Sequence, residues 1–408
     1  MKSSKFYSYL IIYLLLLFKA GFFFVESFAR YTNIFLMVLV FWYLTVKRRG
    51  LNKVAVIFAA LTIFLELLTF VLKGFPEVEF FISCIVNLVL VVLVVSSIDL
   101  NHFKCAFSDI NYVICIASLI CFLLHFIGLP LYQICPLLIN SHGEGGYFAL
   151  FSIPRVEFSE WATYRIQGIY WEPGAFQFFI IVSAIIDLYR DSYSGQKRFF
   201  RIIIYVLTAI LTFSTTGIIG SILVIFLYVY KVRKDTVVPL VTFASFIFLA
   251  IIYGLIDEDS YFYYSLFGKL NSINESYAYG SSSNESAEVR MNAFVYVLDE
   301  FLNSPIVGIG QSGNVELTRK GVAMTTFTPL NIFAFYGILL GLLHVIGITL
   351  VMRLKNKPFL EALLVFFILT LSTVSEQFAF NPILMCFSAY GYAAYMPLYK
   401  RRINPQVI

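Results

Sequence analysis

The chain has 408 residues, of which 60% are hydrophobic and 13% are charged, and its formal net charge at pH 7 is +5. A soluble domain carries about 25% charged residues, so the composition excludes a water-soluble globular protein and predicts one that lies in a lipid bilayer. The basic residues fall in short clusters between apolar runs, which membrane topology explains, so the positive charge does not indicate a nucleic-acid partner.

The apolar runs are continuous rather than alternating, which favours helices over a β-barrel. We predict an all-α, polytopic helical membrane protein with about twelve transmembrane helices, in which residues 1–408 form a single integral membrane domain. The predicted spans cover residues 9–28, 32–46, 54–72, 78–97, 110–128, 174–189, 201–214, 216–230, 236–255, 326–352, 358–375 and 379–398. The two spans within 201–230 meet at Ser214-Thr215-Thr216-Gly217, which is either a tight turn or a break inside one region.

The distribution of Lys and Arg sets the orientation. With the amino terminus inside, most of the 29 basic residues fall in short cytoplasmic segments, as the positive-inside rule requires. Both termini are then cytoplasmic, and two large extracytoplasmic loops cover residues 129–173 and 256–325. Function usually lies on loops that a scaffold positions. Within the second loop, residues 287–302 carry apolar side chains at helical spacing and predict an amphipathic helix that ends at Asn303-Ser304-Pro305.

The end of the first loop holds the strongest candidates for chemistry. Arg165 lies shortly before the span that begins near Gly174. A guanidinium binds phosphate with two parallel hydrogen bonds and keeps its proton, although a lipid-headgroup anchor or a surface ion pair is the simpler interpretation. Glu172 stands at the start of the span, where the helix dipole favours an acid. Alternatively, its carboxylate accepts a proton from a sugar hydroxyl.

The neighbours of these two residues complete a candidate binding segment. Gly168 and Gly174 permit close approach of the backbone. Tyr170 and Trp171 are either part of an interfacial aromatic belt or surfaces on which sugars stack. Gln167 lies in the same segment, and we include it among the candidate substrate-binding residues.

The second loop adds further candidates. Arg290 is the sole basic residue between Lys269 and Arg319. Paired in space with Arg165, it would clamp a pyrophosphate. Gly308 and Gly310 form either a plain turn or a substrate contact, and Asn331 follows in the next span, where small and polar residues most often serve helix packing.

Three charged residues lie in or beside spans. Lys19 and Glu66 lie inside early spans and are candidates for an ion pair. Glu376 ends the span 358–375, where it is either functional or simply solvated. The six cysteines show no C-x-x-C pairing, the four histidines are scattered, and no Walker motif is present. Any chemistry is therefore expected to be metal-independent, to use no cofactor and to draw on a lipid-borne donor.

The order of these features resembles a known family. The shared features are Arg165-x-x-Gly168-x-x-x-Glu172-Pro173-Gly174, a large outside loop carrying Arg290, Pro305-x-x-Gly308-x-Gly310, and Asn331 with Gly337 in the following span. Over residues 160–345 this pattern resembles the Wzy-type polysaccharide polymerases of the O-antigen polymerase/ligase superfamily. The first five spans match in general character alone.

The resemblance implies a lipid-carrier-dependent glycosyltransferase of the bacterial inner membrane. Such enzymes join oligosaccharide repeat units carried on undecaprenyl pyrophosphate, at the outer face, into O-antigen, capsule or exopolysaccharide. A chain-length regulator and a flippase are expected partners. By this resemblance Arg165 and Arg290 would hold the pyrophosphate leaving group, and Glu172 would be a base or an orienting group.

Two alternatives stay open. O-antigen ligases usually carry a catalytic histidine in the second large loop, and residues 256–325 contain none, which favours polymerase over ligase. A polysaccharide transporter or flippase would more naturally show broken helices and buried charge at mid-bilayer in paired halves, and the two halves of this sequence show no matching pattern.

Overall fold

The computed structural model describes residues 2–24, 28–73, 78–129, 147–148, 150–152, 165–233, 285–310, 328–351, 359–374, 376, 378 and 381–396. These residues are almost entirely helical. The helices are α1 (Lys2–Ala20), α3 (Ala29–Val46), α4 (Lys53–Leu72), α5 (Val78–Ser97), α6 (Leu100–Phe126), α8 (Pro173–Leu188), α9 (Gly195–Leu211), α10 (Thr215–Arg233), α14 (Glu285–Asn303), α16 (Thr328–Val351), α17 (Phe359–Ser372) and α18 (Pro382–Tyr395). The strands β1 (Tyr147–Phe148) and β2 (Phe151–Ser152) form an antiparallel hairpin.

The all-α prediction is confirmed for the described residues. Each predicted span coincides with a described helix, except 236–255, which lies outside the described residues. By length and composition, α4, α5, α6, α10 and α16 are apolar enough to cross a membrane, and α3, α8 and α17 contain shorter apolar helices. The total of twelve crossings and the two large loops stay predictions.

Two predicted boundaries were wrong by eight residues or more. The first predicted span runs to residue 28, whereas α1 ends at Ala20 and Gly21 then pairs with Tyr170 in an isolated β-bridge. The predicted span at 110–128 begins ten residues later than α6 does. The first turns of α6 carry polar residues such as Lys104, so a search for apolar runs does not detect them. The Lys104 ammonium group donates to the carbonyl of Val351 at 2.5 Å.

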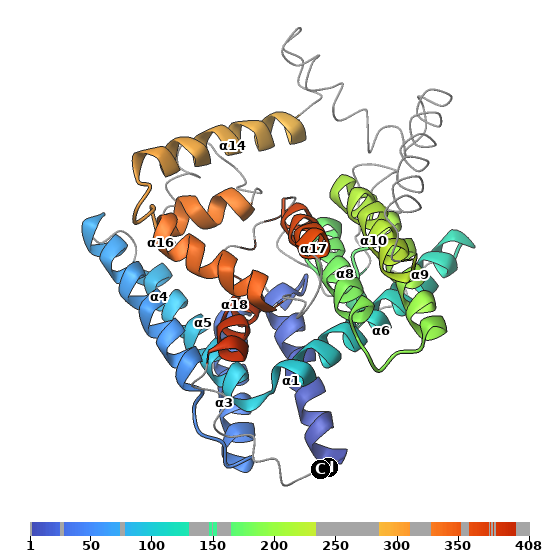
Figure 1. The fold of residues 1–408 in the computed structure, drawn as a ribbon, viewed down its shortest axis with the longest axis horizontal. Coiled ribbons are helices and arrows are strands. Elements are labelled where there is room, and N and C mark those ends of the chain that lie inside the picture. The colour runs from blue at the N-terminus through green and yellow to red at the C-terminus, as the bar shows by residue number, and fades with distance from the viewer. Residues whose placement is uncertain are drawn as a thin grey trace, which may run out of the picture.

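Residues 212–214 form a tight turn between two separate helices. α9 ends at Leu211, Phe213 adopts a positive φ of 48°, and α10 begins at Thr215. The two helices pack against each other and against α8 (Figure 1). Of the two interpretations of this region, the tight turn is confirmed, but it lies earlier than predicted, because Thr215, Thr216 and Gly217 are already in α10.

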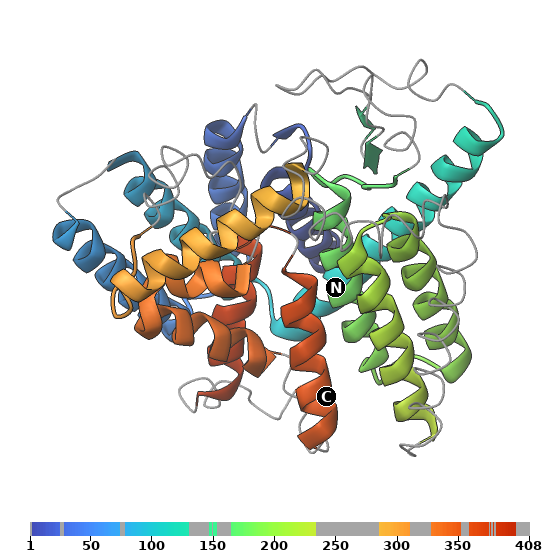
Figure 2. The same ribbon diagram turned by 90° about the horizontal axis from the view of Figure 1, so that it is seen from above.

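The helices form two groups joined by a central layer. Figure 1 shows α3, α4 and α5 on one side and α8, α9 and α10 on the other, with α1 and α18 between them and α16 beneath α14 at the upper end. α1 begins at the lower end of this view, and α14 lies across the upper end; the view from above shows α14 extended over α16 (Figure 2). The hydroxyl of Thr69 on α4 donates to the carbonyl of Val307, which follows α14, at 2.7 Å.

α14 is the amphipathic helix that the sequence predicts. It packs on α16 with Ala293 and Val297 buried, and the ring of Phe301 lies 6.3 Å from that of Phe333. Val295 and other residues on the opposite face are exposed. The helix therefore lies along the molecule's upper surface with one apolar face held down.

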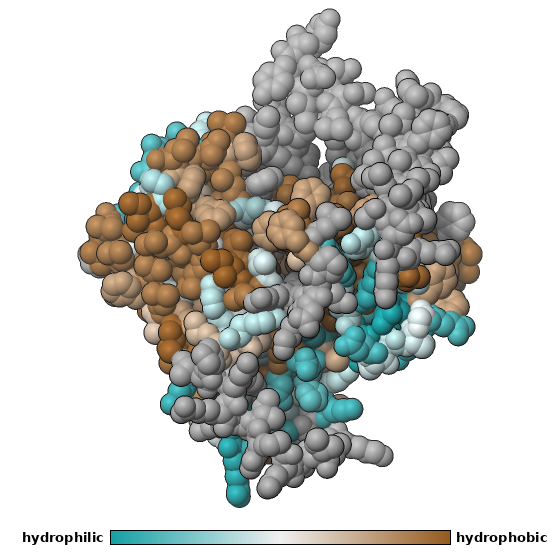
Figure 3. All heavy atoms as spheres, in the orientation of Figure 1, coloured by the Kyte–Doolittle hydropathy of each residue, from teal (hydrophilic) through white to brown (hydrophobic). Residues whose placement is uncertain are grey.

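Exposed apolar side chains form a broad surface over α3 and α4. Phe35, Val38 and Phe41 on α3 and Phe64 on α4 are all more than half exposed. Figure 3 shows brown, hydrophobic residues over this side of the molecule and teal, hydrophilic residues towards the lower end. An apolar surface of this extent is what a bilayer would cover.

α8 is the most enclosed helix near the candidate segment. Every residue from Gly174 to Leu188 is buried, and α6, α9, α10 and α17 pack around it. A helix that is apolar on all sides must be surrounded by other helices or lipid. The amino-terminal end of α8, which carries Glu172, is therefore held in a fixed place.

A buried ion-pair network secures the other end of α8. The guanidinium of Arg201 on α9 lies 2.5 Å from the Asp187 carboxylate on α8 and 3.1 Å from Asp109 on α6. Arg190 pairs with Asp109 at 2.8 Å, and the Tyr205 hydroxyl donates to Asp187 at 2.9 Å. Opposite charges and hydroxyl donors together offset the cost of burying these groups.

The Tyr193 phenol, in the loop after α8, joins this network. Its hydroxyl donates to the Asp109 carboxylate at 2.9 Å. Burial, followed by the charge of the nearby Asp187, raises the pKa of Tyr193. The phenol therefore stays protonated and acts as a donor at neutral pH.

Candidate functional site

The ends of two helices hold the segment that precedes α8. The last carbonyl groups of a helix have no partner within it. The backbone N–H of Ile166 donates to the carbonyl of Leu211 at 3.2 Å, at the end of α9. At the end of α1, the N–H of Trp171 donates to the carbonyl of Ala20 at 3.1 Å. The polar segment is thus fixed by the ends of α1 and α9.

Arg165 itself takes part in this arrangement. Its Nε donates to the carbonyl of Thr212 at 3.0 Å, just beyond the end of α9. A cation at this point is favoured by the helix dipole. The bond uses one of the five N–H donors of the guanidinium and fixes the group at the same end of the molecule as the first turn of α8.

Gly168 and Tyr170 pack the segment between α6 and α8. Gly168 has a φ of +60°, and a Cβ there would lie 2.9 Å from Ile114. The Tyr170 ring is fully buried and stacks on Phe179 at 4.3 Å. Gln167 is also buried. In this structure these residues support the segment from within, so the Tyr170 ring is not a surface on which a sugar can stack.

Trp171 and Gly174 meet a residue from a distant part of the chain. The indole N–H of Trp171 donates to Glu376 Oε2 at 3.0 Å. A Cβ on Gly174 would lie 2.2 Å from the other carboxylate oxygen of Glu376. The backbone carbonyl of Glu376 accepts a hydrogen bond from the Thr328 hydroxyl at the start of α16. The sequence singled out Glu376 but not these contacts, of which Trp171 lies 205 residues away along the chain and Thr328 lies 48 residues away.

The Glu172 carboxylate lies at the amino-terminal end of α8. Glu172 has extended backbone angles at the cap position of α8, and its side chain makes no capping hydrogen bond. Among the described residues, no hydrogen bond or ion pair involves its carboxylate, and the side chain is partly exposed. It stands at the positive end of the α8 dipole, within a segment whose backbone is fixed on both sides.

Lys19 adds a cation beside the same segment. Its ammonium group donates to the amide oxygens of Asn33 and Asn87, so the predicted pairing with Glu66 is wrong. The carbonyl of Lys19 accepts from the Asn381 amide at 3.0 Å. Lys19 directly precedes Ala20, whose carbonyl accepts from the Trp171 backbone, and its ammonium group lies against Asn33 on α3 and Asn87 on α5.

Gly308 and Gly310 belong to a clamp around a break in α16. Gly337 interrupts that helix with a φ of 66° and a ψ of 179°. Ile309 N–H donates to the carbonyl of Ala334 at 3.0 Å, and Gly310 N–H to that of Phe335 at 2.8 Å. These bonds satisfy carbonyls that the break would otherwise leave without partners.

Gly308 and Gly337 lie where the backbone of another segment leaves no room for a Cβ atom. A Cβ on Gly308 would lie 2.4 Å from the carbonyl oxygen of Phe335, and one on Gly337 would lie 2.2 Å from that of Ile306. Asn331, in the first half of α16, is fully buried. The structure therefore gives Gly308 and Gly310 a role in backbone packing, which is the turn interpretation rather than a substrate contact.

Arg290 lies in α14, but its side chain is not among those that the structure describes. α14 packs on α16. The proposed pairing of Arg290 with Arg165 stays a prediction. Within the described ranges, no group of three or more His, Cys, Asp or Glu side chains is arranged to hold a metal ion.

Comparisons of the chain with protein-family models, with curated proteins and with solved structures found no match.

Proposed function

We propose that the chain is a polysaccharide polymerase that joins oligosaccharide units carried on a polyprenyl pyrophosphate. The observation that carries this proposal is the set of charged groups at one end of the helices. Arg165 and Glu172 lie on a segment fixed by the ends of α1 and α9, and Lys19 is in the last turn of α1. Fixed cations next to an acid at a membrane surface suit an anionic, lipid-linked sugar substrate.

The proposed reaction is glycosyl transfer with a pyrophosphate leaving group. A hydroxyl oxygen of the incoming unit attacks the anomeric carbon of the growing chain. The bond from that carbon to the pyrophosphate breaks, and the polyprenyl pyrophosphate leaves with the bonding electrons. The proton of the attacking hydroxyl passes to a carboxylate. The chain moves onto the incoming unit, which keeps its own lipid.

Each charged residue has one role in this reaction. Arg165 stabilises the negative charge that develops on the departing pyrophosphate, which requires fixed positive charge rather than proton exchange. Arg290 would share that role from α14. Glu172 accepts the hydroxyl proton or orients the hydroxyl. The remaining candidates, including Trp171 and Gly174, hold the segment in place.

The break in α16 favours one alternative function, transport, because discontinuous helices in transporters often bind solutes. In this chain the backbone groups at the break are occupied. Ile338 N–H donates to the carbonyl of Pro305 at 2.8 Å, in addition to the two bonds from Ile309 and Gly310. A break closed by backbone hydrogen bonds offers few groups to a solute, so the polymerase proposal is preferred.

The setting of the proposed activity is the outer face of the bacterial inner membrane, with both termini cytoplasmic. The expected partners are a flippase that delivers the lipid-linked units and a chain-length regulator. The lack of a histidine in residues 256–325 favours polymerisation over ligation of finished polymer to an acceptor.

The test is the surface polysaccharide profile of a strain that lacks the gene. The strain is complemented with wild type, Arg165→Ala, Glu172→Gln or the control Arg49→Ala. Arg49 forms a partly exposed ion pair with Asp99 at a predicted cytoplasmic loop. We expect single repeat units in the deletion strain and a restored ladder with wild type and Arg49→Ala.

The two site variants should not restore the ladder although they are present in the membrane in normal amounts. Removing a group that stabilises developing charge typically slows a reaction about 100- to 1000-fold. An unchanged profile in the deletion strain would refute the proposal. Long lipid-linked polymer that is not transferred would identify a ligase instead.

A further inference from the structure

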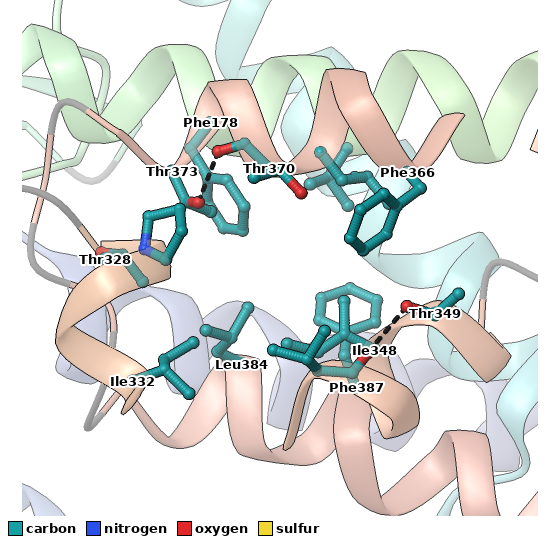
Figure 4. Close-up of a pocket in the computed structure, with 14 residues that line it drawn as sticks. Phe178, Thr328, Ile332, Ile348, Thr349, Phe366, Thr370, Thr373, Leu384 and Phe387 are labelled. Carbon is teal, nitrogen blue, oxygen red and sulfur yellow. Dashed lines mark hydrogen bonds between the residues drawn. The ribbon is translucent and has the colours of Figure 1, made fainter. Parts of the chain in front are cut away.

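A groove runs between two pairs of helices close to the candidate site. α8 and α17 form one wall, and α16 and α18 form the other, as Figure 4 shows. The space between the two walls is about 600 Å³, a volume that includes the part open to the outside. Its lining includes Phe178 and Val182 on α8, Ile332 and Ile348 on α16, Leu369 on α17 and Leu384 on α18.

The threonines of the groove add little polarity. The Thr373 hydroxyl donates to the carbonyl of Thr370 at 2.8 Å, and the Thr349 hydroxyl donates to that of Val345 at 2.8 Å (Figure 4). The Thr328 hydroxyl is bonded to the backbone of Glu376. Hydroxyls bonded to backbone leave mainly their methyl groups for the groove. A polar solute would lose its hydration there without replacement, whereas a hydrocarbon chain would not.

The groove is closed near the candidate site and open at its other end. Thr328 and Phe178 are buried, whereas Phe366 is 38% exposed and Thr349 is also exposed. Along α17 the lining runs from Thr373 to Phe366, which is about 10 Å of helix. The open end lies among apolar side chains, so a chain would enter from the lipid rather than from water.

Aromatic contacts connect the closed end to the candidate site. The Phe178 ring lies 4.4 Å from that of Phe378, and Phe378 lies 5.4 Å from Trp171. Trp171 in turn is bonded to Glu376, whose backbone accepts from Thr328 in the groove wall. The closed end of the groove is therefore separated from Trp171 by the packed rings of Phe178 and Phe378, which would have to turn aside for a chain to reach from the site into the groove.

We infer that this groove holds the polyprenyl chain of the lipid carrier while its pyrophosphate lies at the segment that contains Arg165 and Glu172. The inference rests on the proposed function. Branched side chains such as Ile332 and Ile348 give the walls an uneven surface, which suits a methyl-branched chain. Because the chain comes from lipid, which is as apolar as the groove, its packing against the walls rather than removal from water holds it. That packing aligns the reacting end with the charged residues.

The experiment uses the purified full-length chain in lipid nanodiscs. The probe is geranylgeranyl pyrophosphate with a photoreactive diazirine near the end of its hydrocarbon chain, and labelled peptides are identified by mass spectrometry. Val345→Trp fills the groove from α16, and Thr370→Trp fills it from α17. The matched control is Ile346→Trp, because Ile346 is the next residue, is 47% exposed and does not line the groove.

We expect labelling of α16 and α17 in wild type and in Ile346→Trp, and at least fivefold less labelling in both groove variants. The second groove variant guards against misfolding of the first, and each variant is checked for a single peak in size-exclusion chromatography. Equal labelling in well-folded groove variants would overturn the inference. Equal labelling by a diazirine-bearing phosphatidic acid would also overturn it, since the groove would then hold ordinary membrane lipid.

The two proposals can fail separately. Labelling depends on lipid binding alone and needs no sugar. If the groove discriminates in favour of the prenyl probe but deletion of the gene leaves the polysaccharide unchanged, the groove assignment is supported and the polymerase proposal is refuted.

Discussion

Gly337→Ala is the sharpest test of the clamp around the break in α16. The new Cβ would lie 2.2 Å from the carbonyl oxygen of Ile306 and 2.7 Å from the carbonyl carbon of Val307. Both are backbone atoms, so the segment 305–310 must move away from α16. Its three backbone hydrogen bonds to Ala334, Phe335 and Ile338 then lengthen or break.

The expected loss of stability follows from two contributions. A residue other than glycine at a φ of 66° and a ψ of 179° is strained by about 1–3 kcal/mol. Each lost backbone hydrogen bond contributes about 0.5–1.5 kcal/mol. Together these give roughly 3–7 kcal/mol, which is a large part of the stability of most folded proteins.

Gly128→Ala is the matched control for this change. Gly128 also has a positive φ, of 87°, but a Cβ there would meet nothing within 4 Å. It should lose about 1–2 kcal/mol through backbone strain alone. The measurement is the midpoint of unfolding in mixed micelles containing increasing SDS. If the two variants unfold within about 0.5 kcal/mol of each other, which is near the usual limit of such comparisons, the clamp does not contribute what we assign to it.

Two further changes test other contacts. Gly174→Ala would press a methyl group against the Glu376 carboxylate, so we expect a loss of about 1–2 kcal/mol and shorter polysaccharide. Gly195→Ala, also in the first turn of its helix but with nothing within 4 Å of a new Cβ, should leave both unchanged; equal behaviour of the two variants would refute the contact. Arg201→Met leaves the buried Asp187 without its closest cation and should lose about 3–5 kcal/mol in the same SDS titration. Adding Asp187→Leu should recover most of that loss, and a double variant no more stable than the single one would contradict a buried ion pair.

Local sequence pattern was sufficient for much of the fold. The spans predicted at 54–72 and 78–97 match α4 and α5 to within one residue, because each is an uninterrupted apolar run between polar residues. The amphipathic spacing of 287–302 likewise predicted α14. Where a helix begins with polar residues, as α6 does, the apolar run starts too late to reveal it.

The contacts of the candidate site were not accessible from local pattern. Trp171 and Glu376 are hydrogen-bonded although many helices separate them along the sequence. No periodicity around either residue predicts that it contacts the other. The same holds for Gly308 and Gly337, whose backbones meet at the break in α16. Sequence reasoning identified the residues, but their partners depend on how the helices pack. Lys19 illustrates this, because two asparagines take the place of the acid that charge alone suggested.

The most direct test of the central claim is polymerisation by the purified chain. Lipid-linked single repeat units are extracted from the deletion strain and incubated with wild type, Arg165→Ala, Glu172→Gln or Arg49→Ala in nanodiscs. Our account predicts a ladder of longer lipid-linked chains, with one polyprenyl pyrophosphate released for each unit added, for wild type and Arg49→Ala alone. Failure of folded wild-type protein to lengthen the units, or full activity of Arg165→Ala, would contradict it.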